Sequence, residues 1–224
     1  MTNEIPLLVL GAGGTAADVL ELFADSTGPD GARYHILGLL DDNPDLHGKS
    51  ISGHRILGAL ADVGGWPEAM VADTLGSLRS HRRRAEIVAR LGIDPGRFAT
   101  LVHPTALVAD SAIIGTGAIV YPHTMIGPRV QLGSHVTVLS HSVVNHDSRV
   151  GDYSILASHV ALAGRVTVGA GCYLGMGARV IQDAGIGDGA LVGMGSVVIR
   201  DVPAGAVVAG NPATTLPTRD QTAE

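Results

Sequence analysis

The chain has 224 residues, which is enough for one large domain or two modest ones. Hydrophobic residues make up 46% of it, aromatic residues only 3%, and 31 residues are glycine, so thin repetitive units filled with aliphatic side chains are favoured over a core of aromatic rings. The net charge of -6 argues against non-specific binding to nucleic acid, because no surplus of basic residues is available to neutralise phosphates.

Cysteine content and the first residues bear on the compartment. Cys172 is the only cysteine, so an intramolecular disulfide is excluded and a reducing compartment is favoured. Residues 1–6 lack the basic start of a secretion signal, and the apolar run at residues 7–10 is too short to cross a membrane. We therefore expect a cytoplasmic protein with neither a nucleic-acid nor a membrane partner.

The first hundred residues predict an α/β domain with a Rossmann-like nucleotide-binding turn. A buried strand at residues 7–10 runs into a Gly-x-Gly-x-x-Ala motif at residues 11–16, and a helix follows. Glycines allow a phosphate to approach the backbone, and the helix N-terminus supplies free N–H groups. A tight turn with a purely structural role explains the motif about as well.

A second strand, at residues 35–40, ends in Asp41 and Asp42. Carboxylates at this point of a nucleotide-binding sheet hold a ribose or a base. The alternative is a turn and helix cap made by Asp and Asn before Pro44, and we give it equal weight.

The rest of this region is predicted to hold a third strand at residues 69–72, a helix at 78–91 capped by Ser77, and a last strand at 98–102. We interpret the arginines between residues 79 and 84 as a solvated helix face. The region is too short for a full dinucleotide fold, so half a Rossmann unit that binds one nucleotide is expected. The predicted division is a Rossmann-like nucleotide-binding domain at 1–100, a second domain at 101–216 and a disordered tail at 217–224.

The second domain is marked by an aliphatic residue at every sixth position. Neither a helix nor a simple strand has a period of six, whereas a hexapeptide β-helix does, with three hexads to a triangular coil of 18 residues. The run continues without a slip through Val102, Val108, Ile114, Val120, Ile126, Leu132, Val138, Val144, Val150, Leu156, Leu162, Val168, Leu174, Val180, Ile186, Val192 and Val198.

Residues 18 apart are expected to stack on successive coils. His123, His141 and His159 then form a ladder, which we interpret as structural, with a subunit seam or catalysis as alternatives. Asp147 is expected to lie between the guanidinium groups of Arg129 and Arg165, which gives this carboxylate a structural reason to be present.

His146 is the leading candidate for a catalytic base. It lies at a corner of a coil that offers few other groups able to take a proton at neutral pH. Asp147 beside it can fix the tautomer of the ring and stabilise the imidazolium. Gly164, one coil further on, lies level with His146 and can present a backbone N–H to a developing oxyanion. Cys172 occupies a small inward position and is expected to be structural.

The chain resembles the PglD/NeuD-type bacterial sugar acyltransferases over residues 6 to 216. The resemblance is carried by residues 11–14, 40–44, 103–104 and 145–147 together with the hexads. It implies a Rossmann-like domain followed by a left-handed β-helix, in a homotrimer. It also implies direct transfer of acetyl from acetyl-CoA to the amine of a nucleotide-linked 4-amino-sugar, without a metal.

Carried over by matching motif, the resemblance implies a role for each candidate residue. The catalytic group is His146 as base, Asp147 as its orienting partner and the Gly164 amide as oxyanion donor. The nucleotide-sugar is expected at Gly11, Gly13, Gly14, Thr15, Asp41, Asp42 and Ser77. Acetyl-CoA is expected along the later coils between subunits, at Gly164, Arg165, Gly175, Gly193 and Pro212.

Three alternatives stay open on the sequence alone. A sugar or sialic acid O-acetyltransferase would use the same base. A non-catalytic scaffold would use the coils only to trimerise a nucleotide-binding domain. A zinc site shared between subunits, as in γ-carbonic anhydrases, would recruit the histidine ladder.

Overall fold

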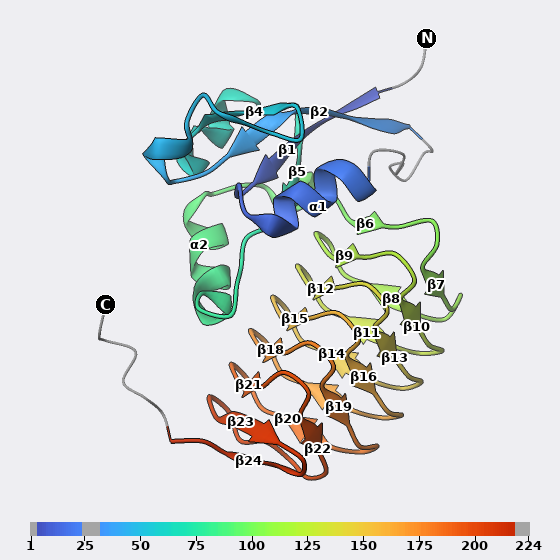
Figure 1. Ribbon diagram of the computed structural model, residues 1–224. Coiled ribbons are helices and arrows are strands. Elements are labelled where there is room, and N and C mark those ends of the chain that lie inside the picture. Colours follow the sequence, from blue (N-terminus) through green and yellow to red (C-terminus); the bar gives the residue numbers. More distant parts are fainter. Residues whose placement is uncertain (1–3, 24–31, 218–224) are drawn as a thin grey trace.

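The structure, a computed structural model, describes residues 4–23 and 32–217. A small N-terminal sheet stands at one end of a column of β-helical coils, and the helix α2 points from the sheet down the side of the column (Figure 1). The part of the tail predicted to be disordered beyond residue 217 lies outside the described residues. No helix in the two described stretches combines the length and apolar character needed to span a membrane.

The N-terminal sheet has the order β3-β4-β2-β1-β5. All neighbouring strands are parallel except β3 and β4, which form an antiparallel hairpin. The strands are β1 (Glu4–Leu10), β2 (Arg33–Leu40), β3 (Ser50–Ile51), β4 (His54–Gly58) and β5 (Met70–Asp73). The helices are α1 (Gly14–Leu22) and α2 (Arg84–Arg90), with short 3-10 turns at η1 (Pro44–Leu46), η2 (Leu60–Gly65), η3 (His81–Arg83) and η4 (Pro95–Arg97).

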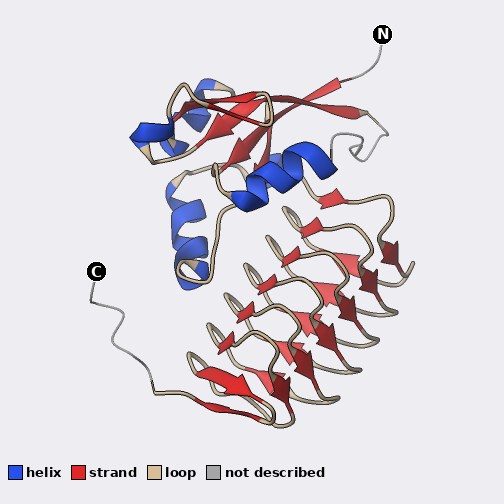
Figure 2. Ribbon diagram, in the orientation of Figure 1, coloured by secondary structure: helices blue, strands red, loops and turns tan. Residues whose placement is uncertain are grey.

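The prediction of a Rossmann-like domain is wrong. Only the β1–α1–β2 connection is a helical crossover, whereas β2 reaches β5 through 3-10 turns and the β3–β4 hairpin (Figure 2). A doubly wound sheet needs helices on both faces. Here the first coils share one face of the sheet with α1, because Leu101, Ile119 and Tyr121 pack with α1 against it, and the other face is covered by the turn η2 and by α2. The molecule is therefore a β-helix with a small mixed cap.

The helix predicted at residues 78–91 is also shorter than expected. It begins as the 3-10 turn η3 and continues as α2, which has seven residues. Ser77 does serve the turn before it, because its Oγ accepts a hydrogen bond from the Arg79 amide at 3.2 Å. The arginine run is not a uniformly solvated face. Arg84 is fully buried, and Arg82 donates from Nε and Nη2 to the carbonyl oxygens of Gly189 and Gly205, both at 2.8 Å.

The hexad prediction is confirmed strand by strand. Each predicted aliphatic position is the second residue of a two-residue strand, and strands 18 residues apart pair in parallel. They are β6 (Leu101–Val102), β7 (Leu107–Val108), β8 (Ile113–Ile114), β9 (Ile119–Val120), β10 (Met125–Ile126), β11 (Gln131–Leu132), β12 (Thr137–Val138), β13 (Val143–Val144), β14 (Arg149–Val150), β15 (Ile155–Leu156), β16 (Ala161–Leu162), β17 (Thr167–Val168), β18 (Tyr173–Leu174), β19 (Arg179–Val180), β20 (Gly185–Ile186), β21 (Leu191–Val192) and β22 (Val197–Val198). A final hairpin, β23 (Val207–Gly210) and β24 (Ala213–Thr215), closes the column.

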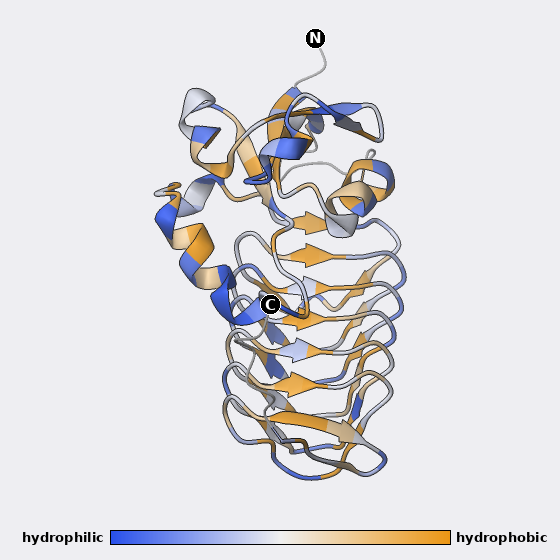
Figure 3. Cartoon of the chain, turned by 60° about the vertical axis from the view of Figure 1, so that its left-hand side comes forward, coloured by the Kyte–Doolittle hydropathy of each residue, from blue (hydrophilic) through white to orange (hydrophobic). Residues whose placement is uncertain are grey.

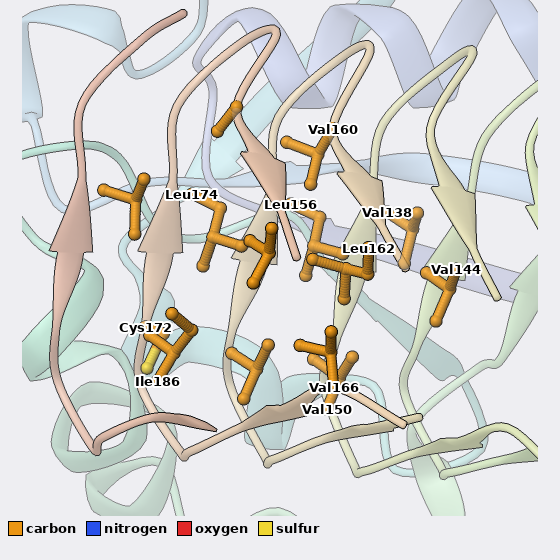
Figure 4. Close-up of a cluster of buried hydrophobic side chains, with 14 of the residues drawn as sticks. Val138, Val144, Val150, Leu156, Val160, Leu162, Val166, Cys172, Leu174 and Ile186 are labelled. Atoms are coloured by element: carbon orange, nitrogen blue, oxygen red, sulfur yellow. The ribbon is translucent and has the colours of Figure 1, made fainter. Parts of the chain in front are cut away.

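The aliphatic residues fill the inside of the column. Val138, Leu156 and Leu174 are fully buried and point inward one above another, as Figure 4 shows. Cys172 lies in the same core, fully buried, and burial raises the pKa of its thiol. The prediction of a buried structural cysteine is therefore confirmed, because a protonated, inaccessible sulfur is a poor nucleophile.

The column has three faces, which we name by their strands. The first face (β6, β9, β12, β15, β18, β21) adjoins the N-terminal sheet, the second consists of β7, β10, β13, β16, β19 and β22, and the third of β8, β11, β14, β17 and β20. The first residue of each strand points outward. On the second face these residues are mostly apolar: Leu107 is 71% exposed, and Met125 and Val143 are half-buried. Figure 3 shows the strands of the first face nearest the viewer, and these are mainly hydrophobic.

Candidate functional site

His146 lies at the corner between the second and third faces, directly after β13. The preceding residue anchors the corner, because the Asn145 backbone amide and side-chain Nδ2 both donate to the Leu162 carbonyl, at 3.1 and 2.7 Å. The imidazole itself stays accessible, with 48% of its side chain exposed. Its Nδ1 lies 2.8 Å from Oδ2 of Asp147. The predicted pair is therefore in place.

Asp147 holds the imidazole through one oxygen and Arg129 through both. Arg129 Nε donates to Oδ1 at 2.6 Å and Nη2 to Oδ2 at 2.9 Å. The hydrogen bonds from Arg129 and then from His146 hold the pKa of Asp147 well below its usual range. The carboxylate is therefore ionised at neutral pH and is placed to accept a hydrogen bond from Nδ1–H of His146. This arrangement leaves the lone pair on Nε2, where a base can use it.

Gly164 lies against the ring, as the spacing of 18 predicts. A Cβ at this position would be only 2.6 Å from Cε1 and Nε2 of His146, so only glycine fits. Ser148 braces this corner from inside, because its Oγ donates to the Ala163 carbonyl and accepts from the Val166 amide, both at 3.1 Å. Among the described residues the Gly164 amide has no hydrogen-bond acceptor. A free N–H beside Nε2 is what oxyanion stabilisation requires.

The arginine–aspartate ladder differs from the prediction at one end. Arg165 does not share Asp147 with Arg129. Its Nε and Nη2 donate to Asp183, at 2.5 and 2.9 Å. The reason is the next coil: Asp183 occupies the equivalent position 18 residues on and offers Arg165 a carboxylate of its own. Asp147 therefore pairs with one arginine, Arg129, through both oxygens, and its Oδ2 also contacts His146.

A cavity of about 430 Å³ lies between the N-terminal sheet and the first face of the coils. It collects most residues predicted to bind the nucleotide-sugar. The start of α1 forms one wall, and Gly13, at the N-cap, makes no side-chain cap, so the first amides of the helix face no capping group. The predicted residues that line the cavity are Gly11, Gly13, Gly14, Thr15, Asp41 and Ser77.

The two neighbouring aspartates have different surroundings. Asp41 lines the cavity, and its carboxylate accepts hydrogen bonds from the amides of Ala12 and Asn43, both at 2.8 Å. Asp42 does not line it, because Oδ1 accepts from the Leu60 amide at 3.0 Å and caps η2 instead. The structural alternative, a turn and helix cap before Pro44, is formed by Asp41 and Asn43, since Asn43 Oδ1 accepts from the Asp45 amide at the start of η1. Asp41 therefore combines this turn with a place in the cavity wall, and Asp42 has a structural role at η2.

Sequence reasoning missed the opposite wall of the cavity, which the coils supply. Thr137, Ile155 and Tyr173 are the outward residues of successive strands on the first face, and Leu139 completes the wall. Their spacing of 18 was a usable signal. The sequence did not show which of the three faces would be covered by the N-terminal sheet.

The residues predicted to bind acetyl-CoA do not come together within one chain. Gly164 and Arg165 lie beside His146, whereas Gly175 and Gly193 follow β18 and β21 at the corner between the first and second faces. Gly175 has a packing role as well, since a Cβ there would lie 2.6 Å from the Met194 amide nitrogen. Pro212 lies in the final hairpin between β23 and β24.

The histidine ladder is present and stacked. Ring centroids are 5.2 Å apart between His123 and His141, and 5.0 Å apart between His141 and His159. Across residues 4–23 and 32–217, no group of three or more His, Cys, Asp or Glu side chains is arranged to hold a metal ion. The absence of a metal from the reaction stays a prediction.

Comparison with known proteins identifies solved structures of similar shape. The acetyltransferase domain of PglB from Neisseria gonorrhoeae FA1090 is 31% identical, with a TM-score of 0.80 over 94% of this chain and 99% of that one. The same domain was also solved with acetyl coenzyme A, at a TM-score of 0.81. PerB from Caulobacter crescentus, in complex with CoA and GDP-perosamine, is 28% identical, with a TM-score of 0.79 over 94% and 97% of the two chains. No protein-family model and no curated protein sequence matches this chain.

Proposed function

The chain belongs to the bacterial hexapeptide-repeat sugar acetyltransferases, and from this premise we propose that it transfers acetyl from acetyl-CoA to the amine of a nucleotide-linked amino-sugar. The single observation that carries the chemistry is the His146–Asp147 pair set against the glycine at position 164. The PerB structure with CoA and GDP-perosamine supports the substrate class. The cavity beside α1 is the proposed place of the nucleotide.

The proposed reaction is a direct transfer. The amine nitrogen of the sugar attacks the thioester carbonyl carbon while His146 Nε2 takes a proton from the nitrogen. The negative charge that develops on the carbonyl oxygen is stabilised by the Gly164 N–H. The C–S bond then breaks, the amide is released, and the proton on His146 is available to the departing CoA thiolate. Asp147, ionised throughout, stabilises the imidazolium formed on the way.

A substrate panel tests this function. Amino-sugars linked to uridine, thymidine or guanosine diphosphate are incubated with acetyl-CoA, while released CoA thiol and product mass are followed. One of these compounds is expected to gain a single acetyl group on nitrogen, with one thiol released per product. Acetylation of a hydroxyl alone would indicate the O-acetyltransferase instead. If none of these compounds causes release of CoA thiol, or if they bind without turnover, the proposal is contradicted and the non-catalytic scaffold is favoured.

A homotrimer is part of the proposal, because one chain keeps the two halves of the site apart. The cavity lies on the first face, and His146 lies at the corner between the other two faces, which is the corner opposite the first face in a triangular coil. A nucleotide-sugar bound in one chain therefore needs the base of a neighbour. Apolar residues of the second face, such as the exposed Leu107 and the half-buried Met125, offer a surface for that neighbour. A cytoplasmic location stays a prediction.

Mixed assemblies of two inactive variants test the shared site. His146→Ala removes the base, and Gly13→Trp fills the cavity from a position where a side chain meets no protein atom within 4 Å. Each variant alone is expected to be inactive. Co-expressed in equal amounts, they should recover about a quarter of wild-type turnover, because each site independently draws an intact cavity and an intact base with even odds. If turnover does not recover, each site is built within one chain.

A further inference from the structure

Three buried groups meet where the N-terminal sheet joins the coils. Asp73, at the end of β5, and Arg84, at the start of α2, form an ion pair with 3.1 Å between Oδ2 and Nη2, and both side chains are fully buried. His135, on the coils, places Nδ1 2.9 Å from the same Oδ2. Its ring stacks on Tyr153, with 4.6 Å between centroids. We call Asp73, Arg84 and His135 the buried cluster.

Burial of the Arg84 guanidinium at this position is energetically unfavourable. Its Nε and Nη1 are buried and have no acceptor within the described part of the chain. A buried guanidinium with unsatisfied donors disfavours the folded state, and apolar residues of similar size commonly replace buried ion pairs without loss of stability. Packing alone therefore gives no reason for a charged residue here, and the surroundings of the cluster indicate a different one.

The buried cluster holds residues 74–80, which we call the pocket loop. The Leu75 amide donates to Oδ1 of Asp73 at 3.1 Å, and Arg84 Nη2 donates to the Asp73 carbonyl, also at 3.1 Å. Gly76, with φ of +115°, passes so close to Arg84 that a Cβ would lie 3.1 Å from its Cδ. The cluster therefore contacts the loop through a hydrogen bond, through the peptide that precedes it and through close packing.

The pocket loop forms a wall of the cavity next to the glycine turn that precedes α1. Gly76 and Ser77 line this cavity, as do Thr74 and Leu75 before them. Since the loop contains neither a helix nor a strand, its shape depends on what holds it from behind. His135 supplies the connection to the coils, and the coils supply the other wall of the same cavity.

We propose that the buried cluster is a positioning device, which fixes the pocket loop against the coils and so sets the width of the nucleotide-sugar cavity. The identity of the ligand rests on the proposed function, whereas the hold of the cluster on the loop does not. The three residues act through the loop and touch no substrate. Their loss is therefore expected to raise the KM for the nucleotide-sugar and to leave kcat and the KM for acetyl-CoA unchanged.

Two substitutions of His135 separate its hydrogen bond to Asp73 from the packing of its ring. The residue has φ of 58°, which asparagine and glycine both tolerate. Both substitutions remove the ring stacked on Tyr153, but only His135→Asn keeps a donor near the position of Nδ1. Arg97→Ala is the matched control: it removes hydrogen bonds to the Ala69 and Trp66 carbonyls, at 2.9 and 2.7 Å, near the opposite end of β5.

Hydrogen–deuterium exchange of the full-length wild type and variants, without ligand, tests the hold directly. In His135→Gly the amides of residues 75–80 are expected to exchange about tenfold faster, as the loss of one hydrogen bond to a buried carboxylate implies. In His135→Asn and Arg97→Ala they should stay within about twofold of wild type. Equal exchange in the glycine and asparagine variants would overturn the proposal.

Kinetics then tests the consequence for the substrate. His135→Gly is expected to raise the KM for the nucleotide-sugar about three- to tenfold with kcat within twofold. Gly76→Ala reaches the loop directly, because its Cβ would lie 2.9 Å from Ile155 Cδ1, and it should shift the same constant. The positioning role would be refuted if kcat fell by as much as the KM for the nucleotide-sugar rose, or if this KM were unchanged in both variants. A fast-exchanging loop in a protein whose wild type acetylates none of the amino-sugars would instead refute the proposed function alone.

Discussion

Replacing His146 by alanine is expected to lower kcat by about 10²- to 10⁴-fold, which is the usual contribution of a positioned general base. Binding of the nucleotide-sugar should persist, because His146 is not among the residues that line the cavity. Stability should change by less than about 0.5 kcal/mol, since the ring is half exposed and packs against little besides Gly164. Steady-state kinetics and thermal shifts with the nucleotide-sugar measure both effects.

Arg129→Ala is the control for this prediction. It removes the charged partner of Asp147 on the same corner, while the hydrogen bond from His146 to Asp147 remains possible. If the pair with His146 is what matters for catalysis, Arg129→Ala should keep kcat within about tenfold of wild type and Asp147→Asn should lose more. If His146→Ala lowers kcat by less than tenfold, His146 is not the base.

The coils could be predicted in detail because their period is a whole number of residues. A repeat of 18 fixes which residues are neighbours on successive coils, so the contact between His146 and Gly164 followed from counting alone. The same argument predicted the stacking of His123 on His141. Counting by 18 failed once, for the partner of Arg165. Asp183 lies 18 residues after Arg165 and belongs to the same ladder, but the prediction did not include it.

The N-terminal region was harder to predict because local patterns do not show what covers a sheet. A strand, a glycine-rich turn and a helix occur as predicted, yet the coils pack beside that helix on the same face of the sheet, and 3-10 turns stand where further helical crossovers were expected. Arg84 illustrates the same limit. Within an arginine-rich run nothing marks it as buried, because its partner Asp73 lies at the end of β5 and His135 lies on the coils.

Replacing Arg84 by methionine is expected to lower the free energy of unfolding by about 3–5 kcal/mol at neutral pH, the usual loss when one partner of a buried ion pair is removed. Asp73 would then be a buried carboxylate with only His135 and the Leu75 amide as partners. Urea unfolding measures the change. Arg90→Met is the matched control on the same helix, since Arg90 is 60% exposed and lies 3.9 Å from Glu86, so a change below about 0.5 kcal/mol is expected there.

The loss in Arg84→Met should also depend on pH, with a sign that follows from Asp73. Burial alone would raise the pKa of this carboxyl, but the charge of Arg84 and the hydrogen bond from His135 hold it below its usual value. A lowered pKa stabilises the folded state above the pKa of the unfolded chain, about 3.9, and that stabilisation is lost as the pH falls through the folded value. The difference between wild type and Arg84→Met should therefore be largest near neutral pH and shrink below about pH 4. A difference that grows on acidification would mean that Arg84 does not hold Asp73 in its ionised form.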